Sequence, residues 1–161
     1  MCGPTGVGKS HVANGLGIEA LKREFRVLSY SVHHLLKNLH TAQASGGHAR
    51  LLSKVLNTDL LILDDFGLYP LTPQASQDLY EIISERYERR SIIITSNRAF
   101  EEWAEVFNND LLAGAALDRL THHTHTIIIR GSSYRQRQRR KEEGTATALP
   151  ADGNGCTPPA S

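Results

Sequence analysis

The feature that most constrains the fold of this chain is the segment 3–10, which reads G-P-T-G-V-G-K-S. This spacing of glycines before Lys-Ser is typical of a loop that wraps the phosphates of a nucleotide and leads into a helix. The glycines let the backbone curl with its amides turned inward, because a Cβ there would crowd the ligand or forbid the backbone angles. We therefore predict nucleotide binding by Gly3, Pro4, Thr5, Gly6, Val7, Gly8, Lys9 and Ser10.

The last two residues of this loop have specific expected roles. Lys9 places an ammonium against the β- and γ-phosphates of ATP, and the Ser10 hydroxyl is a ligand for Mg²⁺. We predict that a helix begins at Ser10, where its N-terminus adds positive partial charge to the anion site. Apolar and small residues then recur at helical spacing and predict one buried stripe, made of Ala13, Leu16, Gly17, Ala20 and Leu21.

Beyond the loop, strand and helix patterns alternate along the chain. Apolar runs predict strands at residues 25–32, 59–66, 91–97 and 125–131. Helical patterns lie between them, at residues 33–57 with an interruption at 45–47, from Pro73 onward with Thr72 as the N-cap, and at 100–122. This alternation predicts an α/β fold, a mostly parallel sheet flanked by helices, with its ligand at the carboxyl ends of the strands.

The composition sets further limits. With 161 residues, of which 40% are hydrophobic and 22% charged, the chain can bury one core of ordinary size, and its net charge of +1 does not by itself indicate a nucleic-acid partner. Cys2 and Cys156 are the only cysteines, so neither a disulfide framework nor a zinc spacing is present. Because the sequence has no membrane-length apolar run and no secretory leader, we expect no membrane partner and a cytoplasmic location.

An acidic pair ends the predicted strand at residues 59–66. A hydrophobic strand that ends in two acids is the Walker-B arrangement, in which we expect Asp64 to hold Mg²⁺ through water. Asp65 would orient or deprotonate the attacking water. The alternative is a solvated turn or a helix cap. One strand and helix separate the loop from these acids, as in the additional-strand class of P-loop ATPases.

Two polar residues farther along the chain are candidates for the same site. Asn97 ends the next strand, where its amide can contact the γ-phosphate or the water, although asparagine is also common in plain turns. Arg119 lies on the last predicted helix and can act as a finger that reaches the nucleotide of a neighbouring subunit. Its alternative role is a surface ion pair with an acid such as Asp118.

The histidines near residue 122 do not predict a zinc site. His122, His123 and His125 are close in sequence, but no cysteine or further acid at ligand spacing completes a ligand set. A junction between a helix and a strand also exposes histidines readily.

The end of the chain changes in composition. Six of the twelve residues 130–141 are basic, which suits either contacts to DNA phosphates, with Tyr134 available to stack, or a solvated helix end. The residues that follow are poor in large apolar side chains and cannot bury enough surface to order themselves. We therefore expect an ATPase core over residues 1–135 and a basic, then low-complexity, disordered tail over 136–161.

Several phrases together resemble the IstB-like ATP-binding proteins, which are AAA+ helpers of insertion-sequence transposition related to the DnaC helicase loaders. The phrases are GPTGVGKSH, LLILDDFGLYPL, YERRSIIITSN, EEWAEVF, ALDRLTHH and GSSYR, and they span about residues 3–135. The resemblance implies an AAA+ P-loop NTPase that forms a homo-oligomer, binds double-stranded DNA nonspecifically and recruits or stimulates a transposase. It also places Asp65, Asn97 and Arg119 at the water, sensor and finger positions, and Arg135 at a second sensor position.

Two departures from that family pattern stand out. Asp65 occupies a position where many AAA+ enzymes have glutamate, and the shorter side chain is expected to slow hydrolysis without abolishing ATP binding. The family pattern also has a helical DNA-binding segment and then an interior strand before the loop, between the strands that end near residues 97 and 131. Because only Met1 and Cys2 precede the loop here, we expect a largely missing first strand and a truncated or decayed form of an active parent.

Alternative functions remain open from the sequence. A helicase-loading ATPase shares the same nucleotide machinery, and a non-functional fragment of either protein is a third reading. A GTPase is disfavoured because no N-K-x-D motif occurs in the chain. A small-molecule kinase is disfavoured because no acceptor site is recognisable.

Overall fold

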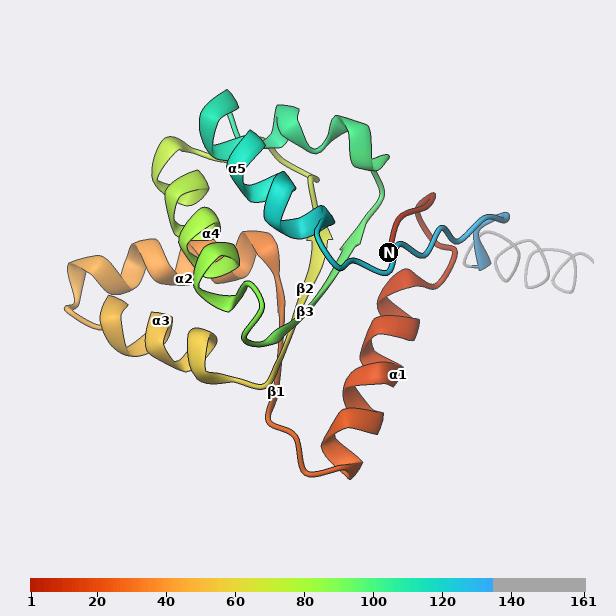
Figure 1. Cartoon of the computed structure of the whole chain (residues 1–161), viewed down its shortest axis with the longest axis horizontal. Helices are drawn as coiled ribbons and strands as arrows, with labels where there is room; N and C mark the ends of the chain where they lie inside the picture. The colour runs from red at the N-terminus through yellow and green to blue at the C-terminus, as the bar shows by residue number, and fades with distance from the viewer. Residues whose placement is uncertain (135–161) are drawn as a thin grey trace, which may run out of the picture.

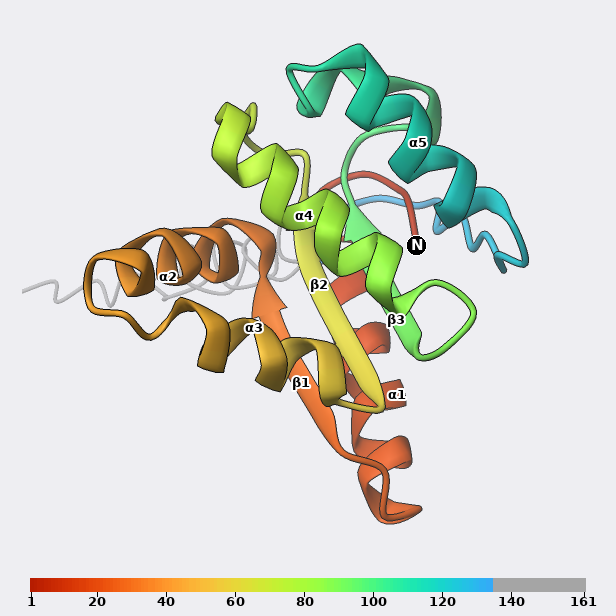
Figure 2. The ribbon, with the colours of Figure 1, turned by 60° about the vertical axis from the view of Figure 1, so that its left-hand side comes forward.

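The structure is a computed structural model, and it describes residues 1–134 (Figure 1). Its elements, in chain order, are α1 (Lys9–Lys22), β1 (Val27–Ser31), α2 (Val32–Ala44), α3 (His48–Asn57), β2 (Leu60–Phe66), α4 (Pro73–Arg86), β3 (Ser91–Ser96), two 3-10 turns (Phe100–Glu102 and Ala104–Val106) and α5 (Asp110–Thr121). The strands form a parallel sheet in the order β1-β2-β3. Figure 2 shows α1 on one face of this sheet and α3 and α4 on the other.

The central strand β2 organises the core. It is a continuous apolar run whose first four residues are all buried, as expected for a parallel strand covered on both faces. Leu61 and Leu63 pack into the larger cluster with α2 and α4, whereas Ile62 packs with Ala13 of α1 on the opposite face. This arrangement confirms the predicted parallel α/β sheet flanked by helices.

Local signals set the helix boundaries much as predicted. The hydroxyl of Thr72 accepts a hydrogen bond from the Ala75 amide at 3.3 Å, so Thr72 caps α4 and Pro73 is its first residue. The predicted interruption at residues 45–47 separates α2 from α3. The helical pattern over 100–122 is two 3-10 turns followed by α5, which Asn109 caps through the Leu112 amide at 3.0 Å.

The apolar stripe predicted on α1 is only partly correct. The helix begins at Lys9, one residue early, and buries Ala13 and Gly17, whereas Leu16 and Leu21 are 46% and 55% exposed. The reason is close packing on the sheet: a Cβ at Gly17 would lie 2.8 Å from Cδ1 of Ile62. Small residues therefore form the contact, and the large ones lie on the outer side of α1.

The first residues of the chain pair with two separate segments. Cys2 forms parallel bridges to Ser96, at the end of β3, and to Ile128. The Cys2 amide donates to the Ile127 carbonyl at 2.9 Å, and the Ile129 amide donates to the Cys2 carbonyl at 2.9 Å. This confirms the prediction that the residues before the loop lie between the strand that ends near residue 97 and the segment that ends near residue 131.

The predicted strand at residues 125–131 is wrong. Within the described residues this segment forms an isolated bridge at Ile128, and its side chains from His125 to Ile128 are exposed. A ladder needs successive paired residues on both strands, and here Cys2 is the one residue that bridges to it.

A buried arginine ties the opposite end of the sheet together. Arg86, the last residue of α4, is 1% exposed. Its Nη1 donates to the carbonyls of Val55 at 2.7 Å and Thr58 at 2.8 Å, and its Nη2 donates to the carbonyl of Ser91 at 2.7 Å. Burial lowers the pKa of Arg86 to about 10, so the guanidinium stays charged at neutral pH. One side chain thus links the end of α3, the approach to β2 and the start of β3.

We expect Arg86→Met to lower the free energy of unfolding by about 3 kcal/mol or more, since the three carbonyls bonded most closely, out of five that accept from Arg86, each lose a partner worth about 1 kcal/mol. Urea denaturation measures this change. The matched control is Arg89→Met, which removes an exposed pair with Glu85 at 3.3 Å and should cost under about 1 kcal/mol. Equal losses in the two variants would contradict a structural role for Arg86.

Candidate functional site

The predicted phosphate loop lies at the carboxyl end of the sheet and at the N-terminus of α1 (Figure 1). Gly8 has a φ of 98° and caps α1, and a Cβ there would meet nothing within 4 Å, so this side of the loop is open. At Gly6, by contrast, a Cβ would lie 2.2 Å from the Ser133 hydroxyl oxygen. Glycine is therefore required at Gly6 by close approach of the chain and at Gly8 by backbone conformation.

Lys9 is held inside this loop. Its side chain is buried, and Nζ donates to the carbonyls of Gly3 at 2.8 Å and Pro4 at 2.9 Å. Burial lowers the pKa of the Lys9 ammonium from its ordinary value, and the nearby carboxylates of Asp65 and Asp64 oppose that shift. An ammonium has three donors, so one remains to bind a phosphate oxygen.

Ser10 and Asp64 meet although they lie 54 residues apart in the chain. The Ser10 hydroxyl, in the first turn of α1, donates to Oδ1 of Asp64 at 2.9 Å. The same oxygen accepts a hydrogen bond from the hydroxyl of Thr95 on β3. The end of the phosphate loop, β2 and β3 therefore converge on one carboxylate oxygen.

Thr95 was missed by the sequence reasoning. It is fully buried, and besides bonding Asp64 its hydroxyl oxygen accepts the Asp65 amide at 3.1 Å. The sequence shows only a threonine within an apolar strand two residues before Asn97, which is a weak signal. The pairing of β3 with β2 is what gives Thr95 its role.

Asp65 is turned outward by a bulge in β2. Leu63 pairs with Ile94 and Phe66 pairs with Ser96, so β2 has one residue more than β3 in this interval. Asp65 has a φ of 57° and is exposed, a left-handed conformation that aspartate tolerates better than most residues. The bulge gives the two acids different environments, because Asp64 is hydrogen-bonded within the site and Asp65 is open to solvent.

Asn97 is the first residue after β3, at the point where the end of this strand lies against the phosphate loop. The Gly3 amide donates to the carbonyl of Ser96 at 3.2 Å, which places the exposed Asn97 beside the start of the loop. This position is compatible with the predicted contact to a phosphate or a water.

Among the described residues, the hydrogen bond and the ring contact of Arg119 are made to α5 and α4 and not to the phosphate loop. Its Nη1 donates to the carbonyl of Ala115 at 2.8 Å in the same helix, and its guanidinium lies 5.4 Å from the ring centre of Tyr80 on α4. Across residues 1–134, Arg119 forms no ion pair within 4.0 Å, so the alternative pair with Asp118 is not observed.

The segment after residue 128 lies along the loop. The Tyr134 amide donates to the carbonyl of Gly6 at 2.9 Å, and Ser133 lies against Gly6. Arg135, the predicted second sensor, and most of the basic run at 130–141 lie outside the described residues. Sequence reasoning did not anticipate this contact between the chain's later segment and the loop.

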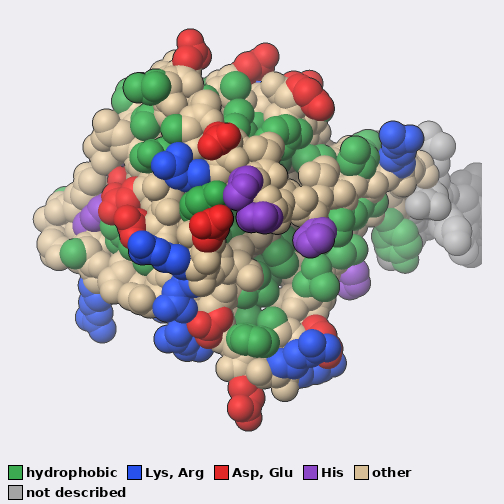
Figure 3. All heavy atoms as spheres, viewed as in Figure 1, with side chains coloured by type: hydrophobic (Ala, Val, Ile, Leu, Met, Phe, Trp, Pro, Cys, Tyr) green, Lys and Arg blue, Asp and Glu red, His purple; other side chains and the backbone are tan. Residues whose placement is uncertain are grey.

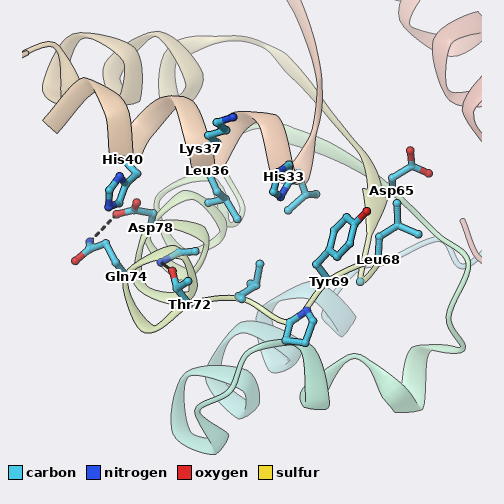
Figure 4. Close-up of a pocket in the computed structure, with 15 residues that line it drawn as sticks. His33, Leu36, Lys37, His40, Asp65, Leu68, Tyr69, Thr72, Gln74 and Asp78 are labelled. Atoms are coloured by element: carbon cyan, nitrogen blue, oxygen red, sulfur yellow. Dashed lines mark hydrogen bonds between the residues drawn. The ribbon is translucent and has the colours of Figure 1, made fainter. Parts of the chain in front are cut away.

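A separate pocket lies beside Asp65 (Figure 4). It has a volume of about 360 Å³ and lies between α2 and the segment after β2, with His33, Leu36 and Tyr69 in its lining. Of the predicted site residues only Asp65 lines it, so this pocket is not the phosphate site.

No helix within the described residues is long and apolar enough to cross a membrane.

Comparison with known sequences identifies the family. The profile described as "IstB-like ATP binding protein" matches residues 1–142. The chain belongs to this family of ATP-binding proteins. It is 48% identical over 141 residues to the insertion sequence ATP-binding protein y4pL of Sinorhizobium fredii, and 39% identical over 141 residues to the IS21 insertion sequence ATP-binding protein of Pseudomonas aeruginosa. These matches cover 88% of this chain but 58% and 53% of the two relatives, so the chain spans somewhat over half of their length.

Solved structures place the IstB-like chain among AAA+ P-loop folds. The crystal structure of the DnaC helicase loader matches with a TM-score of 0.70 and 25% identity, over 80% of this chain and 76% of the loader chain. DnaA from Aquifex aeolicus, in an AMPPCP-bound structure, matches with a TM-score of 0.69 and 22% identity, over 94% of this chain and 46% of that chain. The predicted AAA+ fold class is thereby confirmed.

The residues present suit ATP with Mg²⁺. The donor set of the Ser10 hydroxyl and the Asp64 carboxylate consists of hard oxygen atoms, which Mg²⁺ prefers. The open side of the loop at Gly8 and the buried Lys9 ammonium suit a polyphosphate.

We expect Thr95→Val to weaken the Mg²⁺-dependent part of ATP affinity by about 10- to 100-fold, because the hydroxyl that orients Asp64 is lost without a change of shape. Titration of ATP with and without Mg²⁺ measures the effect. Thr121→Val is the matched control, since its exposed hydroxyl bonds only carbonyls of its own helix. An unchanged Mg²⁺ dependence in Thr95→Val would show that Thr95 is merely packed in the core.

Proposed function

We propose that this IstB-like chain binds ATP with Mg²⁺, hydrolyses it and acts as an ATPase helper of DNA transposition. The observation that carries the proposal is the hydrogen bond of 2.9 Å between Ser10 and Asp64. It joins the end of the phosphate loop to Asp64 near the end of β2, as a metal-assisted phosphoryl transfer requires.

Each residue of the site has a separate proposed role in binding or hydrolysing ATP. Lys9 binds the β- and γ-phosphates through its remaining N–H, and Ser10 and Asp64 hold Mg²⁺, directly and through water respectively. When bound, Mg²⁺ neutralises the charge that develops on the phosphate oxygens. Asp65 accepts a proton from the attacking water or orients it, and Asn97 donates its amide hydrogens to the γ-phosphate or that water.

The local structure supports these roles. The bulge leaves the Asp65 carboxylate exposed while the Thr95 hydroxyl fixes its backbone amide at 3.1 Å. A general base must be both reachable and held in orientation. Asp64 has the opposite environment, because two hydroxyls donate to its Oδ1 and hold it toward α1.

The comparisons favour transposition over helicase loading. The relatives that are named as insertion sequence ATP-binding proteins are 48% and 39% identical, whereas the DnaC helicase loader is 25% identical. We therefore propose double-stranded DNA, bound nonspecifically through phosphates, and a transposase as partners of a cytoplasmic homo-oligomer. Helicase loading is the second candidate, supported by the TM-score of 0.70 to the loader.

The nucleotide proposal is tested with two variants of the site. Lys9→Ala should abolish ATP binding, because it removes the charge held inside the loop, whereas Asp65→Asn should keep binding and lose hydrolysis. ATP affinity and turnover are measured on both variants, with Lys22→Ala, an exposed lysine paired with Glu19, as the control. Equal ATP affinity of the wild type and Lys9→Ala would rule out the phosphate role of the loop.

The assembly proposal is tested by mixing subunits. Arg119→Ala chains keep their own Lys9 and Asp65, and Lys9→Ala chains keep Arg119. If Arg119 acts across an interface, the mixture should hydrolyse ATP although neither variant does so alone, since losing such a finger costs about 10³- to 10⁵-fold in rate. Absence of recovery in a mixture shown to co-assemble would restrict Arg119 to its observed packing on Tyr80.

A further inference from the structure

Three potential metal ligands meet near the end of α5. His122 and His123 follow this helix, and Glu88 lies in the turn between α4 and β3. One ligand atom from each residue lies within 4.8 Å of the other two. Figure 3 shows histidine side chains gathered beside acidic ones on this face of the molecule. The acid that the sequence spacing did not reveal is therefore supplied by a distant segment.

We propose that Glu88, His122 and His123 bind a transition-metal dication of the zinc class. Two imidazoles and one carboxylate are a ligand set that Zn²⁺ uses where a fourth position stays open to water or another ligand. None of these three residues belongs to the proposed nucleotide site. The proposal does not depend on the proposed ATPase function.

Two of the three separations come close to those of a bound ion, and the third, between the two histidines, lies within 4.8 Å. Oε1 of Glu88 lies 3.7 Å from Nδ1 of His122 and 3.9 Å from Nε2 of His123. In a tetrahedral site with bonds of about 2.0 to 2.1 Å, neighbouring ligand atoms are about 3.4 Å apart. Closing each of these gaps takes a movement of a few tenths of an ångström, which exposed side chains can make by rotation.

The surroundings allow a cation to enter. The three side chains are 57% exposed at Glu88, 53% at His122 and 75% at His123. The two imidazole rings have centroids 4.0 Å apart, so both rings lie close enough together to reach one ion. The carboxylate of Glu88 supplies the negative charge that a dication prefers among its ligands.

Tyr87 competes for one of the ligand atoms. Its hydroxyl is 2.6 Å from Nδ1 of His122, the nitrogen that faces Glu88. A metal ion on this nitrogen displaces that hydrogen bond. The phenol is therefore not needed for the site, and removing it should preserve metal binding.

A bound ion would join two elements of the fold. Glu88 belongs to the turn that leaves α4, and His122 is the C-cap of α5, three residues after Arg119. α4 and α5 already contact each other through Arg119 and Tyr80. The ion would fix the end of α5 against this turn, and binding to the folded state alone raises the thermal midpoint with metal concentration.

The test is titration of the full chain with Zn²⁺ alone, and with Co²⁺ followed by visible absorption, in a Cys156→Ser background that removes a competing thiol. We expect one Zn²⁺ per chain and a rise in the thermal midpoint. His122→Ala, His123→Ala and Glu88→Gln should each weaken Zn²⁺ binding by at least about tenfold, since even outer partners of metal ligands cost that much. His125→Ala is the matched control and Tyr87→Phe the second variant, and both should retain binding.

Several results would overturn the proposal. One is equal Zn²⁺ affinity in the wild type and His123→Ala, and another is no binding by the wild type. Binding that Asp64→Asn removes and His123→Ala leaves unchanged would place the ion at the nucleotide site instead. Loss of binding in Tyr87→Phe would show that the three proposed ligands are insufficient. Circular dichroism of each variant confirms that it is folded, as expected for substitutions of exposed side chains.

Discussion

The architecture of this chain depends on the backbone pairing of Cys2. Its bridges to Ser96 and Ile128 hold the start of the phosphate loop against β3 on one side and against the segment near residue 128 on the other. A loop that must present inward-facing amides to phosphates needs a fixed origin, since a shift of its first residue would move every amide. The segment near residue 128 reaches the loop by the same contact, and this brings Tyr134 to Gly6.

From that fixed origin, the site is built by hydroxyls that converge on acidic residues. Ser10 and Thr95 approach Oδ1 of Asp64 from α1 and β3, and the bulge then turns Asp65 to the outside. The two acids are adjacent in sequence but differ in environment, so one can hold a metal and the other can act on water. At the opposite end of the sheet, Arg86 donates to carbonyls at the end of α3, before β2 and at the start of β3, so one buried side chain links these segments.

Helix α5 carries Arg119, the residue proposed to act at the nucleotide of a neighbouring subunit. Arg119 packs on Tyr80 of α4 and donates to a carbonyl of its own helix. The proposed metal ligands His122 and His123 follow in the next residues. Any event that fixes the end of α5 therefore acts close to the residue proposed to complete the site of a neighbouring subunit.

The sequence by itself determined those features whose signal is local. Three features could be predicted from a few neighbouring residues each. They are the phosphate loop from the glycine spacing of residues 3–10, the acids at the end of an apolar strand, and the start of α4 at Thr72-Pro73. The sequence motifs shared with the IstB-like family also predicted the AAA+ fold. Only the tertiary structure decided what depends on pairing between distant segments. It revealed Thr95 as the partner of Asp64 and Glu88 as the neighbour of the histidines, and it showed that residues 125–131 form a bridge rather than a strand. The physical reason is that sequence periodicity shows which side of an element is apolar, whereas packing and register determine which distant side chains meet.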